Sequence, residues 1–145
     1  MADVEGYGLV ILNDFGLIRI DSPIFRPEEN RWQTEIAGEY FSMPDGIIGM
    51  ALTPKINPKD SRYLLYRPYA SHSLYATKTS ELATSREGML KIPFKFAKDV
   101  FPSQVSVFTS SEKGVVFFGV TREIAIACWN IRNKMSKEYF VSKIK

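Results

Sequence analysis

A short apolar segment with two internal glycines, residues 45–54, most constrains how this chain can fold. It reads Asp-Gly-Ile-Ile-Gly-Met-Ala-Leu-Thr-Pro, and turn residues bound it on both sides. An apolar run of this length between turn signals predicts a fully buried strand. Gly46 and Gly49 would let a neighbouring backbone approach closely, as an innermost strand requires. Residues 63–66 and 74–77 are further apolar runs, so we expect a sheet built outward from this strand.

The composition indicates one ordinary globular domain. The chain has 145 residues, of which 45% are hydrophobic and 24% charged, a balance that argues against disorder. The net charge is +3, from 19 basic and 16 acidic residues, and no basic stripe interleaves with aromatic residues. We therefore expect no nucleic-acid partner, and we interpret the lysines beyond residue 133 as a solvated end segment.

No segment indicates a membrane or a secretory leader. The longest apolar stretches fall well short of the ~20 residues of a membrane span. The first residues, Met-Ala-Asp-Val-Glu, contain no cleavable hydrophobic region, which at face value predicts a cytosolic protein. Cys128 is the single cysteine and cannot form an internal disulfide, so it leaves the redox compartment open.

A second group of apolar segments repeats the order of the first. Residues 105–109, 115–119 and 124–129 are predicted strands separated by turns. The two groups begin at Ile47 and Val105, about 50 to 60 residues apart, a period typical of propeller blades. A β-sandwich is the alternative all-β fold.

The other segments are predicted as a hairpin (residues 8–12 and 17–20), an irregular connection (21–33), a short strand (36–41), a helical turn (79–88) and an edge or irregular segment around Pro93 (89–96).

Few residues have the pattern of a catalytic or metal site. His72 and Cys128 are the only residues of their kinds, so no zinc cluster is expected, nor any other metal or cofactor. Ser71 precedes His72 directly, and neighbours along a strand point to opposite faces, so the two cannot act as nucleophile and base; we interpret the histidine as a loop residue. No phosphate loop, HExxH or GxSxG motif is present. Asp45 could face a ligand or simply fix the turn in which it lies.

Several ordered blocks resemble the Yellow / major royal jelly protein family of insects. Residues 2–10 resemble the opening of a blade, and residues 36–39 and 45–54 are similar to the most recognisable block of the family. Residues 62–71 resemble the strand that follows. A third block matches at residues 103–104, 114–118 and 127–130.

The resemblance implies a fold and a set of possible functions. Family members are secreted six-bladed β-propellers more than twice this length, so residues 1–145 would form a partial propeller of about two to three blades. The chain would begin inside a blade, and the missing signal peptide would reflect truncation of a secreted protein. Family roles include cuticle pigmentation through the melanin pathway, dopachrome conversion, binding of biogenic amines and nutrition.

Three function classes follow from the resemblance. The first is a secreted, non-enzymatic protein that binds a small aromatic amine or indole-type ligand, or has a pigmentation-related role. The second is an isomerase-like enzyme that converts dopachrome. The third is a gene fragment without a function of its own.

The propeller geometry predicts where a ligand would bind. Inner strands line the central channel, so the residues just before them, Asp45, Ser103 and Gln104, should lie close together at one end of it and face a ligand. We expect Cys128 to be largely buried next to the aromatic strand and unreactive, with any disulfide partner outside this segment.

An incomplete propeller leaves its terminal blades uncovered. We expect the segments around residues 47–48 and 115–118 to be exposed inner strands that favour intermolecular pairing. The isolated chain should therefore self-associate or aggregate, and should bind amines or dopachrome weakly.

Overall fold

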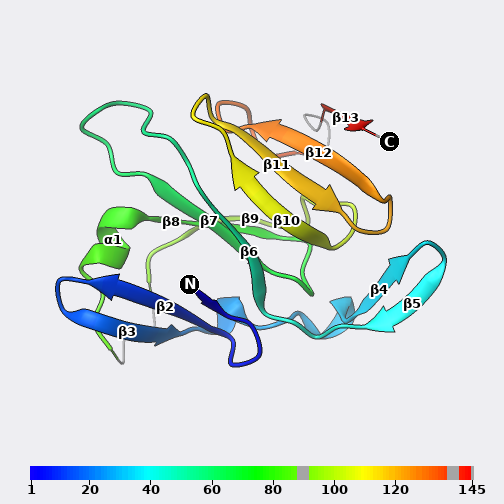
Figure 1. The fold of residues 1–145 in the computed structure, drawn as a ribbon, viewed down its shortest axis with the longest axis horizontal. Coiled ribbons are helices and arrows are strands. Elements are labelled where there is room, and N and C mark those ends of the chain that lie inside the picture. Colours follow the sequence, from blue (N-terminus) through cyan, green and yellow to red (C-terminus); the bar gives the residue numbers. More distant parts are fainter. Residues whose placement is uncertain (88–91, 137–140, 145) are drawn as a thin grey trace.

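The computed structural model describes residues 1–87 and 92–136 and the backbone of residues 141–144, and almost all of its regular structure is antiparallel β-sheet (Figure 1). The N-terminal sheet contains β1 (Ala2–Asp3), β2 (Gly8–Asn13) and β3 (Gly16–Asp21), and a separate hairpin contains β4 (Gln33–Ile36) and β5 (Glu39–Ser42). The middle sheet contains β6 (Ile47–Leu52), β7 (Tyr63–Pro68), β8 (Leu74–Lys78) and β9 (Lys95–Ala97). The C-terminal sheet contains β10 (Val105–Ser110), β11 (Val115–Val120), β12 (Ala125–Asn130) and β13 (Val141–Ile144).

The predicted all-β fold is confirmed, and the chain forms part of a β-propeller. In the middle and C-terminal sheets each strand pairs with the next along the chain, as in a propeller blade and unlike the Greek-key order of a sandwich. Figure 1 shows the middle sheet between the other two, with β6 and β10 side by side and running in the same direction. The inner strands of two successive blades are therefore neighbours.

The two glycines of the first apolar segment have the predicted role. A Cβ atom at Gly46 would lie 2.8 Å from the Tyr7 ring and 2.8 Å from the carbonyl oxygen of Val4. A Cβ atom at Gly49 would lie 2.9 Å from the Cβ of Phe108, on β10. Gly49 thus permits the close approach of β6 to β10.

Two apolar clusters fill the spaces on either side of the middle sheet. One lies between the middle and C-terminal sheets, where the Phe101 ring packs edge-on against Phe118 with centroids 5.1 Å apart. The other includes Leu9, Ile20 and Tyr66 and lies between the N-terminal and middle sheets. Because the middle sheet contributes to both clusters, its two faces are covered.

Arg67, on β7, is buried and links the two larger sheets. Its Nη1 donates a hydrogen bond to the carbonyl oxygen of Val105 at 3.0 Å, and its Nη2 donates to the carbonyl oxygens of Tyr69, at 3.0 Å, and Ser71. Burial lowers the pKa of the guanidinium to about 9, against the opposing effects of Tyr69 and Glu28. Arg67 therefore joins β7 to β10 and holds the loop between β7 and β8.

Several short segments follow the sequence-based expectations. The first hairpin, β2 and β3, is confirmed, and the predicted helical turn is α1 (Thr79–Ala83). The connection 21–33 contains two 3-10 turns, Pro23–Phe25 and Glu29–Arg31. His72 lies in the loop between β7 and β8, as interpreted from the sequence. The edge segment around Pro93 is partly confirmed by β9, whereas its residues 89–91 lie outside the described residues.

Two expectations are wrong in detail. The single short strand predicted at 36–41 is instead the β4–β5 hairpin, with Ala37 and Gly38 at φ values of 54° and 85° in its turn. Residues 115–118 are not an inner strand, because β11 lies between β10 and β12.

The end segment beyond residue 133, interpreted as solvated, contains one strand that the sequence analysis did not predict. This strand is β13, which pairs with β12, and Lys134 before it is exposed.

The prediction that residues 47–48 and 115–118 are exposed holds for alternate residues only. Ile47, Val116 and Phe118 are buried, whereas Ile48 and Phe117 are exposed. Successive side chains of a strand point to opposite faces, so one face packs against the core while the other meets solvent.

Within the described residues, no helix is long and apolar enough to cross a membrane.

We expect Tyr66 to make stability fall at high pH. Its hydroxyl lies 3.0 Å from Oγ1 of Thr77, and burial raises its pKa from 10 to about 12. The folded state therefore holds this proton more tightly than the unfolded state, so the contribution is complete below pH 10 and disappears as the pH rises through 12. Its size is about 2–3 kcal/mol. Urea unfolding at pH 9 and pH 11.5 should show a smaller loss for Tyr66→Phe than for the wild type; equal losses would contradict this assignment.

Candidate functional site: a polar hollow at the start of β10

A polar hollow of about 270 Å³ lies where the β4–β5 hairpin meets the segment that leads into β10. Side chains come from the second 3-10 turn, the hairpin, the loop after β7, the segment before β10 and the turn after β11. The lining residues are Asn30, Arg31, Gln33, Glu35, Tyr40, His72, Pro102, Ser103, Gln104 and Arg122. The hollow thus includes two of the three residues that the sequence predicts to face a ligand.

Gln104 fixes the hairpin against the C-terminal sheet. Its side-chain Nε2 donates to the carbonyl oxygens of Arg31 and Gln33, each at 2.9 Å. Its own carbonyl oxygen accepts hydrogen bonds from the backbone nitrogen and Oγ1 of Thr121, at 2.9 and 2.8 Å. Gln104 is only 5% exposed, so these contacts shape the wall of the hollow.

Ser103 has a comparable supporting position. Its Oγ donates to Oε2 of Glu123 at 2.7 Å and accepts a hydrogen bond from the backbone nitrogen of Arg122 at 3.4 Å. The side chain is buried. Ser103 therefore holds the turn between β11 and β12, which presents Arg122 to the hollow.

Asp45 does not belong to the lining. Its carbonyl oxygen accepts a hydrogen bond from the backbone nitrogen of Ala70 at 3.2 Å, and the neighbouring carbonyl of Pro44 accepts one from the Tyr7 hydroxyl at 3.1 Å. These bonds fit a residue that fixes a turn. β6 and β10 run in the same direction, so Asp45 and Gln104 precede strands that begin at the same end of the pair (Figure 1). Contact of Asp45, Ser103 or Gln104 with a ligand stays a prediction.

The sequence analysis missed Glu35 and Tyr40. They are direct cross-strand partners in the β4–β5 hairpin, so their side chains extend from the same face. The pairing depends on the tight turn at Ala37 and Gly38. Alanine rarely adopts the positive φ of such turns, which favour Asn-Gly or Asp-Gly, so Ala-Gly is a weak hairpin signal.

Glu35 gives the hollow its distinctive charge. It contributes the one carboxylate among the lining residues. The two lining arginines already have acidic partners: Arg31 lies 3.3 Å from Asp99, and Arg122 lies 3.3 Å from Glu123. No ion pair of the described residues involves Glu35. The hollow therefore combines an available carboxylate, a phenol ring and amide groups.

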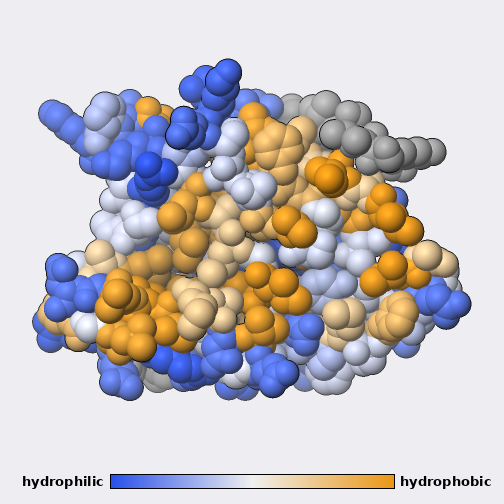
Figure 2. Space-filling model, viewed as in Figure 1, coloured by the Kyte–Doolittle hydropathy of each residue, from blue (hydrophilic) through white to orange (hydrophobic). Residues whose placement is uncertain are grey.

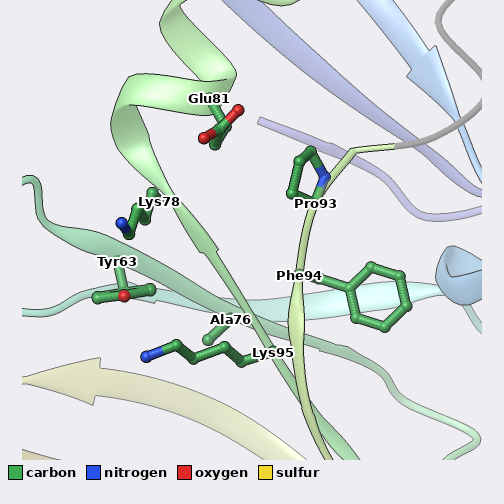
Figure 3. Close-up of a pocket in the computed structure, with 7 residues that line it drawn as sticks. All are labelled: Tyr63, Ala76, Lys78, Glu81, Pro93, Phe94 and Lys95. Carbon is green, nitrogen blue, oxygen red and sulfur yellow. The ribbon is translucent and has the colours of Figure 1, made fainter.

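A second cleft, of about 220 Å³, lies beside β8 and β9 (Figure 3). Its aromatic face belongs to Tyr63, and Nζ of Lys95 already lies 4.7 Å from the centre of that ring. In Figure 3 the ring of Phe94 points away from Tyr63 and Lys78. A cationic ligand would have to displace Lys95, so this cleft fits an amine less well than the polar hollow does.

Ser71 and His72 do not form a nucleophile–base pair, as expected from the sequence. Within the described part of the chain, no group of three His, Cys, Asp or Glu side chains could hold a metal ion. The Ser71 hydroxyl donates to Oε1 of Glu28 at 2.6 Å, which leaves its proton away from His72. Burial raises the pKa values of Tyr66 and Tyr75, but neither residue lines the hollow.

Comparison with known sequences decides the family. The sequence model described as Major royal jelly protein matches residues 1–142. The chain belongs to the major royal jelly protein family. It is 33% identical over 140 residues to Major royal jelly protein 7 of Apis mellifera, covering 95% of this chain and 30% of that protein. Its identity to Major royal jelly protein 9 of the same species is 35% over 132 residues, covering 90% of this chain and 30% of that protein.

The match defines how much of a family protein is present here. The chain spans about 30% of the length of these royal jelly proteins. The match extends to residue 142, well beyond the residue 130 at which the resemblance seen in the sequence ends. The family match thus ends within β13, after its first two residues.

Proposed function

We propose that this major royal jelly family chain is a secreted, non-enzymatic binding protein whose polar hollow takes a small aromatic amine. The observation that carries the proposal is the cross-strand pair of Glu35 and Tyr40 at the edge of the hollow. An ammonium group is recognised by a carboxylate and by the face of an aromatic ring, and this pair offers both. The family membership supports the proposed secretion.

Neutral groups in the lining suit the rest of such a ligand. The side chains of Asn30 and Gln33 can donate to or accept from a ring hydroxyl or an indole nitrogen. The arginines have their own carboxylate partners, and they disfavour a second cation deeper in the hollow. A ligand with one ammonium and one aromatic ring therefore fits better than a diamine.

Binding is favoured over dopachrome conversion by the contents of the hollow. An isomerase-like reaction requires an acid and a base placed on either side of the substrate. Glu35 and His72 are the carboxylate and the imidazole of the lining, and they come from different elements, the hairpin and the loop after β7. A role related to pigmentation would, in this proposal, rest on binding the aromatic amine.

The proposal predicts that Glu35→Gln weakens amine binding. The lost charge-assisted hydrogen bond is worth about 1.5–3 kcal/mol, which raises Kd by roughly 10- to 100-fold. Isothermal titration calorimetry with tyramine and tryptamine measures the change. Glu39→Gln is the matched control, because Glu39 lies on the same hairpin outside the lining and should leave Kd unchanged. Binding by Glu35→Gln at wild-type strength would overturn the proposal.

A further inference from the structure

An apolar cavity of about 200 Å³ lies between the middle and C-terminal sheets. Leu65 on β7 and Ala76 on β8 contribute to one wall, and Trp129 on β12 contributes to the other. Leu65 and Trp129 belong to the apolar cluster that packs these two sheets together, and Ala76 packs against it. Both walls therefore come from described strands of two adjoining sheets.

The cavity differs from the apolar surface that the chain exposes. Figure 2 shows exposed apolar side chains over the N-terminal hairpin and over the C-terminal sheet. Leu17, on β3 of that hairpin, is 72% exposed, whereas Leu65 and Trp129 in the cavity are 3% and 8% exposed. A concave site enclosed by largely apolar side chains is the usual form of a small-molecule site.

Two polar groups of the lining are already bonded within the chain. Oγ1 of Thr53 accepts a hydrogen bond from the backbone nitrogen of Tyr63 at 2.9 Å, and Nε1 of Trp129 donates to the carbonyl oxygen of Asn133 at 3.2 Å. Lys95 is the charged residue of the lining, and no ion pair of the described residues involves it. Its ammonium group can therefore bind the polar end of a ligand.

Lys95 stands at the boundary between the apolar cavity and the cleft beside β8 and β9, because it lines both. Its Nζ lies 4.7 Å from the centre of the Tyr63 ring. Tyr63 pairs with Lys78 and Ala76 pairs with Lys95, so these side chains extend from one face of the middle sheet. In Figure 3 the Tyr63 ring lies between the two ammonium groups.

The boundary has an excess of positive charge. Glu81, on α1, is the carboxylate of the cleft, and Figure 3 shows it farther from Lys95 than Lys78 is. Two ammonium groups and one carboxylate leave one net positive charge beside an apolar cavity. Such a site attracts an anion that carries an apolar group.

We propose that the apolar cavity binds a medium-chain fatty acid, with the acyl chain between the two sheets and the carboxylate at Lys95. A 150 Å³ apolar cavity holds the six carbons of benzene, so one of about 200 Å³ holds a chain of about eight carbons. The ammonium group has three donors, so it can bind a carboxylate and keep its contact with the Tyr63 ring. This site goes beyond the proposed amine site and shares no lining residue with the polar hollow.

A series of acids of increasing length tests the chain in the wild type. Each methylene that enters the cavity should lower Kd about fourfold, hence about 15-fold from hexanoate to octanoate. The gain should stop beyond about eight carbons. The alcohol 1-octanol has the same chain without the charge, and it should bind about fivefold more weakly than octanoate. Isothermal titration calorimetry of the 145-residue chain measures each Kd.

Lys95→Gln tests the position of the carboxylate. This variant should raise the Kd of octanoate about fivefold and remove the preference for octanoate over 1-octanol. Lys98→Gln is the matched control, because Lys98 is an exposed lysine that follows β9 and lines neither the cavity nor the cleft. Its Kd for octanoate should equal that of the wild type.

Ala76→Leu tests the position of the acyl chain. It adds three carbons to the wall, so the gain with chain length should end at about five carbons, and hexanoate and octanoate should then bind equally. Leu17→Gln is the control on the exposed apolar surface and should leave every Kd unchanged. Circular dichroism establishes that each variant folds; the wild-type series and Lys95→Gln decide the case if Ala76→Leu does not.

Affinity that rises to about eight carbons, with the carboxylate preference lost in Lys95→Gln, supports the proposal. No saturable binding of octanoate below about 1 mM overturns it, as does equal binding of 1-octanol and octanoate by the wild type. Weaker binding by Leu17→Gln also overturns it, because the chain would then lie on the exposed surface. Octanoate should not displace tyramine, so the amine proposal is tested independently.

Discussion

Replacing Arg67 with alanine should lower the free energy of unfolding by about 3–5 kcal/mol. The variant leaves the carbonyl oxygens of Val105, Tyr69 and Ser71 without the donors that Arg67 supplies in the buried interior. It also removes a side chain whose guanidinium carbon lies 4.9 Å from the centre of the Phe101 ring. Since a domain is stable by only about 5–15 kcal/mol, this loss is a large fraction of its total stability. Urea denaturation followed by circular dichroism measures the loss.

Arg67→Lys distinguishes the hydrogen bonds from the charge. Lysine keeps the positive charge but cannot direct two separate nitrogens at Val105 on one strand and at the loop carbonyls on the other side. We expect the free energy of unfolding to fall by about 2–3 kcal/mol, which is less than the fall in Arg67→Ala. Wild-type stability in Arg67→Ala would contradict the role of this residue as the link between the sheets.

Gly49→Ala should destabilise the chain by about 3 kcal/mol, since overpacking a close contact commonly costs about 1–3 kcal/mol. The new Cβ would lie 2.9 Å from the Cβ of Phe108 and 3.2 Å from the carbonyl oxygen of Ser106, and neither atom can turn aside without moving β10. Thermal unfolding should show a clear fall in Tm.

Gly119→Ala is the matched control for Gly49. Its Cβ would lie 2.9 Å from Oγ of Ser106, a terminal side-chain atom that can rotate, and 3.8 Å from the nearest backbone atom. This variant should remain within about 1 kcal/mol of the wild type. If both variants lose equal stability, the contact between β6 and β10 is not the close approach that limits position 49.

The position of β6 could be predicted from its sequence, whereas the expected full burial is wrong, because Ile48 and Leu52 are exposed. Turn residues bound the apolar run, and its glycines mark a close approach that the structure shows at Phe108 and Tyr7. The β4–β5 hairpin could not be predicted in the same way. Its turn depends on Ala37 adopting a positive φ, which the surrounding contacts impose rather than alanine itself.

In the candidate site, the positions of two residues could be predicted from the sequence, but their hydrogen-bond partners could not. The position of Ser103 and Gln104 before an inner strand predicts that they lie together at the start of β10, and both line the hollow there. Their contact with a ligand stays a prediction. Their hydrogen bonds to Glu123, Arg31 and Gln33 could not be inferred, because these partners are distant in sequence. The pairing of Glu35 with its neighbour on β5 depends on hairpin register, which a one-residue shift would destroy.

For Cys128, the sequence predicts the neighbouring strand correctly but not the degree of burial. It lies next to the aromatic strand β11, as predicted, opposite Phe117. It is only partly buried, rather than largely buried, because it shares the side of the sheet on which Phe117 is exposed. The sequence indicates the strand and its neighbour, whereas the cover on each face depends on how the sheets are stacked.

The most direct test of the binding proposal is a titration of the ¹⁵N-labelled chain with tyramine, followed by two-dimensional NMR. Binding in the polar hollow predicts chemical-shift changes centred on Glu35, Tyr40 and Gln104, and their loss in Glu35→Gln. Changes centred instead on Tyr63 and Lys95, in the cleft beside β8 and β9, would contradict it, as would the absence of any saturable change.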